Sequence, residues 1–347
     1  MIYVAAGAIT IFLAKIIDVK KIKLPLCKFF TLIIIFLPLI VISSIRFGIG
    51  TDFFNYEDIF SFIKNYNWGI NEYNIEPGFA LLNKLVLHFT NNFQWFIVIT
   101  SIIYLLLVVL FLYFESDNLS YSIFLFLALT FYFSSFNTIR EHLGISIAML
   151  AIPFARKKKF IPFLLIVCAA GMIHYSCFVF LIVYLFNRVY ITPKKSLVIS
   201  IIILLASPLL MPLITKIVGL TPYAKYLNTG SSISIASILG IGFQLFIFLL
   251  ASYYFQNEKK YSFYYSIQYI SLIVCALGGV IPMFSRVKWI FFMPSLILIP
   301  MIFSNIKRQD EKSLIKISTS TLFIIYGFVI VFILRAYEAF PYESILK

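Results

Sequence analysis

Long apolar runs recur along the whole chain and are separated by short polar turns. A helix needs about 20 apolar residues to cross a bilayer, and most of these runs approach that length. Charged residues make up 12% of the chain, whereas an ordinary soluble domain carries about 25%. So few charges cannot cover a surface exposed to water. The sequence therefore predicts an all-α polytopic integral membrane protein.

We expect about ten full spans and one short broken helical hairpin near residues 160–187. The expected full spans are 2–17, 29–45, 93–114, 119–136, 143–155, 196–218, 233–255, 262–284, 287–304 and 315–334. In the hairpin, each half is too short to cross at about 1.5 Å per residue. A break at residues 171–174 keeps its two basic flanks, 156–159 and 188–195, on one side of the membrane.

Lysine and arginine predict the side of each turn, because cytoplasmic turns carry an excess of these residues. The turn after the first span is rich in lysine (Lys20, Lys21, Lys23 and Lys28), which places it inside and both termini outside. Residues 46–78 then form an extracytoplasmic loop of a single transmembrane domain, 1–347. The net charge of +14 is spread over such turns, so we expect no nucleic acid partner.

The predicted outer loop carries acidic, amide and aromatic side chains. It begins at Arg46, continues through Asp52, Asn55 and Tyr56, and ends near Glu76. This mixture suits sugar binding by hydrogen bonds and ring stacking, although a polar loop facing lipid headgroups would have a similar composition.

Three arginines, Arg46, Arg140 and Arg286, fall near the outer ends of predicted spans. The positive-inside rule disfavours them there. An arginine fork binds phosphate through two parallel hydrogen bonds, so these residues are candidate phosphate ligands. The alternative for Arg140 and its neighbour Glu141 is a charged cap in the headgroup zone.

His174 falls at the predicted break of the hairpin. A histidine there can serve as a general base near neutral pH, and the alternative is a histidine packed in the core. Asp52, Glu76 and Glu141 are further candidates for the base. The cysteines and histidines show no spacing typical of a zinc site, so we expect no bound metal.

The motifs form an ordered series. The series runs Arg46…Gly50-Thr51-Asp52…Asn55-Tyr56…Phe60, Glu76-Pro77-Gly78-Phe79, Arg140 with a short span and a basic turn, His174 before a second apolar run, and Ser285-Arg286…Trp289. In order and spacing, the chain resembles the EpsG family of bacterial exopolysaccharide polymerases, relatives of the Wzy-type O-antigen and capsule polymerases. The resemblance runs from about residue 1 to residue 335.

The resemblance implies a membrane-embedded, metal-independent glycosyltransferase without a cofactor, in the bacterial cytoplasmic (inner) membrane. Such an enzyme polymerises polyprenyl-pyrophosphate-linked oligosaccharide repeat units on the outer face. Its partners would be these lipid-linked substrates, membrane lipids, and the chain-length regulator and flippase of the same pathway.

Each candidate residue takes a role in this scheme. Catalysis is assigned to His174, Asp52, Glu76 and Glu141; pyrophosphate binding to Arg46, Arg140 and Arg286; and sugar binding to Asn55, Tyr56, Tyr223 and Tyr226.

Three other activities remain open. A lipid-linked oligosaccharide flippase would share the basic cavity and the number of spans, but internal repeats are frequent in transporters and none is evident here. A membrane O-acyltransferase would share an embedded histidine, but it would draw its acyl donor from the cytoplasmic side. An O-antigen ligase uses the same donor, but its large outer loop falls late in the chain, whereas the longest loop here falls early.

Overall fold

The computed structural model describes residues 1–65, 75–187, 190–220, 235–278 and 284–346. These residues form helices and connecting turns, and the only β-pairing among them is an isolated bridge between Arg46 and Ser344. The prediction of an all-α protein is therefore confirmed. The chain divides into two compact units, one of residues 1–153, 164–178 and 308–347, the other of residues 154–163 and 179–307.

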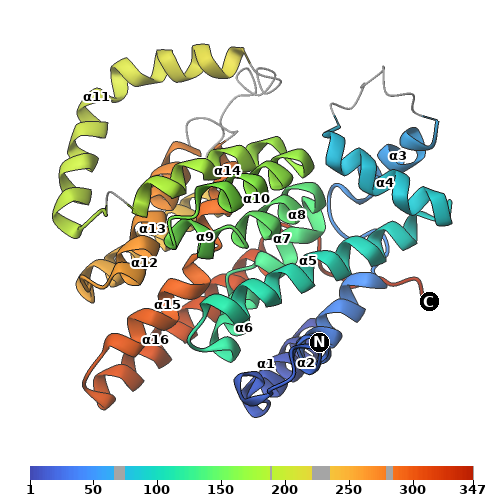
Figure 1. Ribbon diagram of the computed structural model, residues 1–347, viewed down its shortest axis with the longest axis horizontal. Helices are drawn as coiled ribbons and strands as arrows, with labels where there is room; N and C mark the ends of the chain where they lie inside the picture. Colours follow the sequence, from blue (N-terminus) through green and yellow to red (C-terminus); the bar gives the residue numbers. More distant parts are fainter. Residues whose placement is uncertain (66–74, 188–189, 221–234, 279–283, 347) are drawn as a thin grey trace. The chain divides into compact units, whose positions relative to one another are not determined.

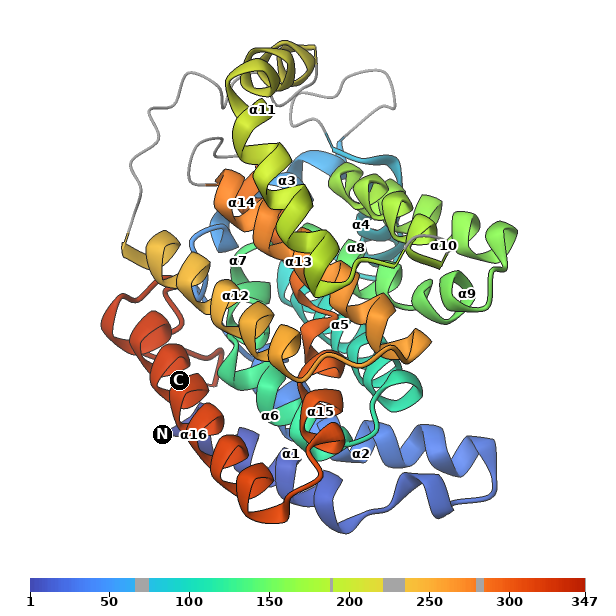
Figure 2. The same cartoon turned by 90° about the vertical axis from the view of Figure 1, so that its left-hand side faces the viewer.

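The first unit holds most of the N-terminal helices and the last one (Figure 1). They are α1 (Ile2–Ile16), α2 (Pro25–Ser44), α3 (Phe53–Lys64), α4 (Pro77–Phe89), α5 (Phe93–Glu115), α6 (Leu119–Ala128), α7 (Phe131–Asn137), α8 (Ile139–Met149) and α16 (Gln309–Phe328), with a short 3₁₀ turn at Val19–Lys21 and a π-helical end at Val329–Ile333. Helix α2 packs against α1 and α5, and α6 packs against α1 and α16 (Figure 2).

The remaining helices belong mainly to the second unit, except that most of α10 and the start of η2 (residues 164–178) belong to the first. They are α9 (Ile152–Arg156), α10 (Phe160–Ile173), the 3₁₀ helix η2 (Tyr175–Asn187), α11 (Pro193–Gly219), α12 (Ile235–Tyr253), α13 (Lys259–Gly278), α14 (Phe284–Phe292) and α15 (Ser295–Asn305). Helix α13 packs against α12, α14 and α15. Between α12 and α13 the Gln268 amide donates to the Gln244 carbonyl at 2.6 Å, a polar link of the kind that joins helices in lipid.

Several described helices are long and apolar enough to cross a membrane. They are Pro25–Ser44, Phe93–Glu115, Val287–Asn305 and Gln309–Ile333, and the bent pair α6–α7 makes a fifth if it is counted as one span. The protein is therefore a membrane protein by its helices. The larger number of about ten spans and the side of each turn remain predictions.

Some predicted elements differ from the observed ones. The span expected at 119–136 is broken, since α6 and α7 meet at 49° and Thr130 between them has a φ of 67°. A residue in this left-handed conformation cannot continue a right-handed helix. The expected span 143–155 is likewise divided, between α8 and α9. The span expected at 287–304 falls within the candidate crossing Val287–Asn305, which has a short turn at Met293 and Pro294, since proline has no N–H to continue the helical hydrogen bonds. The loop expected at 46–78 contains a helix, α3.

The hairpin breaks inside the predicted interval. Helix α10 ends at Ile173 and η2 begins at Tyr175, which leaves His174 at the break. At the base, the Tyr184 hydroxyl donates to the Lys158 carbonyl at 2.9 Å, and the rings of Tyr184 and Phe160 lie 5.0 Å apart. The second half therefore folds back along the first.

Candidate functional site

Three segments of the first unit meet at the tip of the hairpin: the start of α4, the first turn of α8, and residues 171–175. The chain enters α4 through Glu76, with Pro77 in the first turn, where its missing N–H costs nothing. Gly78 follows, and a Cβ atom there would lie 2.9 Å from the Met172 carbonyl oxygen. A glycine is thus needed for α4 to approach the hairpin this closely.

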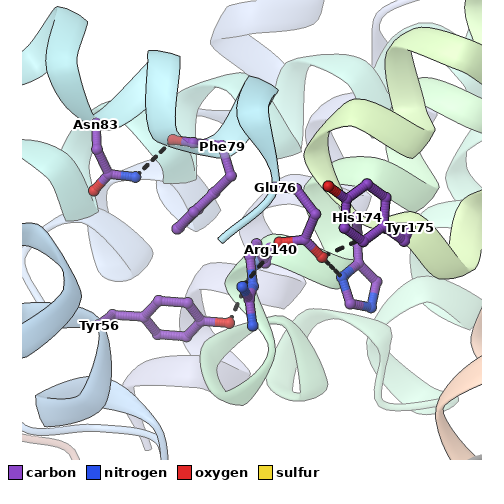
Figure 3. Close-up of polar contacts among 7 residues, drawn as sticks. All are labelled: Tyr56, Glu76, Phe79, Asn83, Arg140, His174 and Tyr175. Atoms are coloured by element: carbon purple, nitrogen blue, oxygen red, sulfur yellow. Dashed lines mark hydrogen bonds and ion pairs between the residues drawn. The ribbon is translucent and has the colours of Figure 1, made fainter. Parts of the chain in front are cut away.

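The Glu76 carboxylate lies between a guanidinium and an imidazole (Figure 3). Arg140 Nη1 donates to Glu76 Oε2 at 2.8 Å, and His174 Nδ1 lies 2.8 Å from Glu76 Oε1. The backbone N–H of Tyr175 also points to Oε1, at 3.4 Å. The residue is only 3% exposed, so one buried carboxylate joins all three segments.

The charge state of Glu76 follows from these contacts. Burial opposes ionisation, but the hydrogen bond from His174 and the positive charge of Arg140 outweigh it and lower the pKa of the Glu76 carboxyl below its usual value. Glu76 is therefore a carboxylate at neutral pH.

The contact with Glu76 determines the tautomer of His174. A carboxylate only accepts hydrogen bonds, so Nδ1 carries the proton. In the neutral ring Nε2 then holds a lone pair. Within the part of the chain that the structure describes, Nε2 makes no hydrogen bond, and the residue is 5% exposed.

Arg140 is held from two further sides. Its backbone N–H donates to the Tyr56 hydroxyl at 3.3 Å, and its guanidinium lies 5.6 Å from the centre of the Phe79 ring. Burial raises the pKa of Tyr56 to about 12, so its phenol stays neutral. The Arg140 side chain is 20% exposed and is the most accessible charged group of the Glu76 cluster, the set Tyr56, Glu76, Arg140 and His174.

Comparison with known proteins decides the family. A family model described as the EpsG family matches residues 29–344, a range that contains the whole Glu76 cluster. The chain belongs to the EpsG family. The resemblance inferred from the motifs is thereby confirmed. No curated protein and no solved structure matches this EpsG-family chain significantly.

Arg46 of this EpsG-family protein lies in a different environment. Its side chain is buried, with 2% of the residue exposed, and Nη1 donates to the Ser43 carbonyl at 2.6 Å and to the Ser101 hydroxyl at 3.1 Å. The guanidinium lies 4.7 Å from the centre of the Phe136 ring. These contacts hold the end of α2 against α5, and no hydrogen bond joins Arg46 to the Glu76 cluster among the described residues.

A second histidine, His142, is fully enclosed next to Arg46. Its Nε2 lies 2.8 Å from the Ser134 hydroxyl, and its Nδ1 lies 2.8 Å from the Thr138 hydroxyl. Arg46 and His142 line a small cavity of about 10 Å³, about the size of one water molecule. With both ring nitrogens engaged, His142 braces α7 against α8.

Among the described residues, no other candidate of the EpsG-family chain donates a hydrogen bond to the Glu76 carboxylate. The Asp52 carbonyl accepts a hydrogen bond from the Tyr56 backbone N–H at 3.0 Å. Asp52 and Asn55 lie at the start of α3 and contact each other at 3.3 Å, and Glu141 is buried beside Arg140 in α8. Arg286 begins α14 in the second unit, and its side chain is outside the described residues. Tyr223 and Tyr226 also lie outside them.

Sequence reasoning did not identify the residues that support His174. A Cβ atom on Gly144 would lie 3.2 Å from the His174 Cβ and 2.7 Å from the Cys177 sulfur. The absence of a side chain at this position of α8 therefore lets the hairpin tip pack there.

No group of three or more metal-ligating side chains occurs in the described ranges.

Proposed function

We propose that this chain is a membrane-embedded glycosyltransferase that polymerises polyprenyl-pyrophosphate-linked oligosaccharide repeat units. The observation that carries the proposal is the Glu76 carboxylate, which binds His174 at one oxygen and Arg140 at the other. A proton acceptor and a cation held on one carboxylate suit a reaction in which a hydroxyl is activated while an anionic group leaves.

In the proposed step, His174 acts as the general base. Nε2 takes the proton from an acceptor sugar hydroxyl, whose oxygen forms a bond to the anomeric carbon of the donor. The bond between that carbon and the pyrophosphate oxygen breaks, and the pyrophosphate leaves with the electron pair. Glu76 orients the ring and stabilises the imidazolium that forms, as a carboxylate does behind a catalytic histidine.

The arginines act on the leaving group. Arg140 offsets the negative charge that develops on the pyrophosphate, and we assign further phosphate contacts to Arg46 and Arg286. The sugars are assigned to Asn55, Tyr56, Tyr223 and Tyr226. Asp52, Glu76 and Glu141 are the alternative bases.

We place the reaction on the outer face of the bacterial cytoplasmic membrane. The support is the distribution of lysine and arginine, which favours the cytoplasmic side. The basic segments that flank residues 160–187 are therefore assigned to the inside, and residues 46–78 to the outside. About ten full spans and the short hairpin belong to the same proposal.

The experiment is to incubate the purified protein with a polyprenyl-pyrophosphate oligosaccharide and to separate the products by size. A polymerase gives a ladder of longer lipid-linked chains. Transfer of the oligosaccharide to a different acceptor without a ladder would indicate a ligase. Movement across vesicles with no new glycosidic bond would indicate a flippase, and transfer of an acyl group would indicate an acyltransferase.

A variant of Arg140 tests the role of the guanidinium in the same assay. Arg140→Lys keeps the charge but removes the planar fork, so we expect most of the chain extension to be lost. Arg308→Lys is the matched control, because that side chain is 75% exposed and, among the described residues, its one ion pair is with Asp310. Near-normal ladders from Arg140→Lys at normal expression would rule out the phosphate fork.

A further inference from the structure

A basic cleft lies in the second unit and shares no residue with the Glu76 cluster. It has a volume of about 310 Å³ and is lined by Arg156, Lys157, Lys158, Tyr190, Lys259, Lys260 and Phe263. The cations come from two places far apart in the sequence, the end of α9 with the turn that follows it, and the start of α13. Tyr190 comes from a third segment, the approach to α11.

The described residues that line this basic cleft carry five positive charges and no negative one. No carboxylate lines the cleft among the described residues. The ammonium groups of Lys157, Lys158 and Lys259 form no ion pair in those parts of the chain. Like charges gathered around one cavity repel one another, so the arrangement favours a bound anion.

The stability of the helices does not account for this arrangement. Lys259 and Lys260 occupy the first turn of α13, which has no acidic residue, although the helix dipole disfavours cations at that end. The positive-inside rule explains why each turn is basic, but it does not require distant turns to share one cavity.

A second basic turn of the chain differs from the basic cleft in its charge balance. The turn after α1 is also basic, yet Lys21 pairs there with Asp18 at 3.5 Å. The neighbouring cavity is lined by Asp18 and Asp117 together with Lys15 and Lys20. In that turn carboxylates lie among the lysines, whereas Lys157, Lys158 and Lys259 of the basic cleft form no ion pair among the described residues.

We propose that the basic cleft binds a phosphate group. Arg156 supplies the planar fork that matches phosphate oxygens, and the lysines supply point charges around it. Phe263 is buried, Tyr190 is half-buried, and both give the cleft an apolar side. The phosphate belongs either to the headgroup of an anionic phospholipid, for which basic pockets at helix ends are suited, or to a soluble phosphate compound.

The test uses the full chain purified in detergent and measures the shift in Tm on adding a ligand. One arm adds phosphatidylglycerol, with phosphatidylcholine as the neutral lipid, and the other adds inorganic phosphate or pyrophosphate. We expect one of these anions to raise the Tm and phosphatidylcholine to have no effect. Stabilisation by phosphatidylglycerol alone identifies the source as lipid, and stabilisation by the inorganic anions identifies it as soluble phosphate.

The variant Lys157→Gln/Lys158→Gln/Lys259→Gln removes exposed charges and should fold normally. At about 1 kcal/mol per cation, its affinity for the anion should fall about a hundredfold. The corresponding Lys→Arg variant should keep the affinity. The matched control, Lys20→Gln/Lys21→Gln/Lys23→Gln, removes as many charges from the compensated turn and should bind as the unaltered chain does.

Two outcomes would overturn the proposal. One is the absence of stabilisation by any phosphate-bearing ligand. The other is an equal loss of affinity in the control variant, which would mean that only the total charge of the protein matters.

Discussion

Glu76 combines two roles at the scale of the single residue. It fixes the tautomer of His174, and it neutralises part of the charge of Arg140. Both roles depend on the negative charge of a buried side chain, so they are lost together when the carboxylate is protonated or replaced.

Acidification should therefore weaken the fold through Glu76. The folded pKa of this carboxyl lies below its unfolded value, so its contribution to stability is complete above the ordinary carboxyl range of about 4 and is lost as the pH falls through the folded pKa. At neutral pH, Glu76→Gln should cost about 1–3 kcal/mol. Its Tm should approach that of the unaltered chain in acid.

The control for this measurement is Glu258→Gln, since Glu258 is exposed and forms no ion pair in the described residues. If the Tm of Glu76→Gln stays below that of the unaltered chain by the same amount from neutral pH into acid, the stabilising role of the ionised Glu76 carboxylate would be contradicted.

His174→Ala should lower the rate of chain extension by about 10²–10⁴-fold, the usual contribution of a general base, while binding of the lipid-linked donor persists. His88→Ala is the control, because His88 is exposed in the last turn of α4. His142→Ala should instead lower the Tm, because it removes contacts to Ser134 and Thr138. Full activity of His174→Ala would move the base to Asp52, Glu76 or Glu141.

At the scale of the elements, the position of His174 depends on how closely α8 approaches the hairpin tip. Gly144 is the residue of α8 at this contact, and its neighbours are His174, Cys177 and Ala170. The break at residue 174 could be predicted because two basic flanks surrounded a stretch too short to cross twice. The packing of α8 against this break could not be predicted, because a single glycine in an apolar run does not indicate which segment packs on it.

The bend between α6 and α7 also could not be predicted. Thr130 adopts a left-handed conformation that threonine rarely takes, and the surrounding residues read as one continuous apolar span. Tertiary packing selects this conformation: Thr130 contacts the Tyr337 hydroxyl, 3.1 Å away and 207 positions along the chain.

Gly144→Ala should displace the hairpin tip and reduce chain extension by up to about a hundredfold without loss of donor binding, since small misplacements of catalytic groups have effects of this size. Cys177→Ala in the same chain should restore part of the rate, because it removes the nearest atom. Gly242→Ala is the control, as nothing lies within 4 Å of the added atom. Equal rates for Gly144→Ala and Gly242→Ala would exclude this positioning role.

At the scale of the whole molecule, the membrane character and the helical class could be predicted from hydropathy alone. The sequence predicts the members of the Glu76 cluster as separate candidates. It does not predict their contacts with one another, since hydropathy does not report which segments meet. The guanidinium of Arg46, a predicted phosphate ligand, contacts Ser43, Ser101 and Phe136, and its role toward phosphate remains a proposal.

The proposed topology can be tested by cysteine labelling in a chain whose native cysteines are replaced by serine. A cysteine at position 58 should react with an impermeant reagent from outside. Cysteines at positions 158 and 195 should react only after the membrane is permeabilised, because the hairpin returns to the side from which it enters. Labelling of positions 158 and 195 from opposite faces would mean that residues 160–187 cross completely.

The pairing between the end of α2 and the segment 342–345 also has a consequence for biosynthesis. The Tyr342 hydroxyl donates to the Ile42 carbonyl, 300 positions earlier, and backbone bonds join Phe47 to Glu343 and Ile345 to Ile45. At about 5–20 residues per second, a ribosome needs roughly 15–60 s to make the intervening chain. For that interval the segment that leads into α3 lacks its final anchor, so a nascent chain arrested before residue 342 should be cut there by proteases that spare the finished protein.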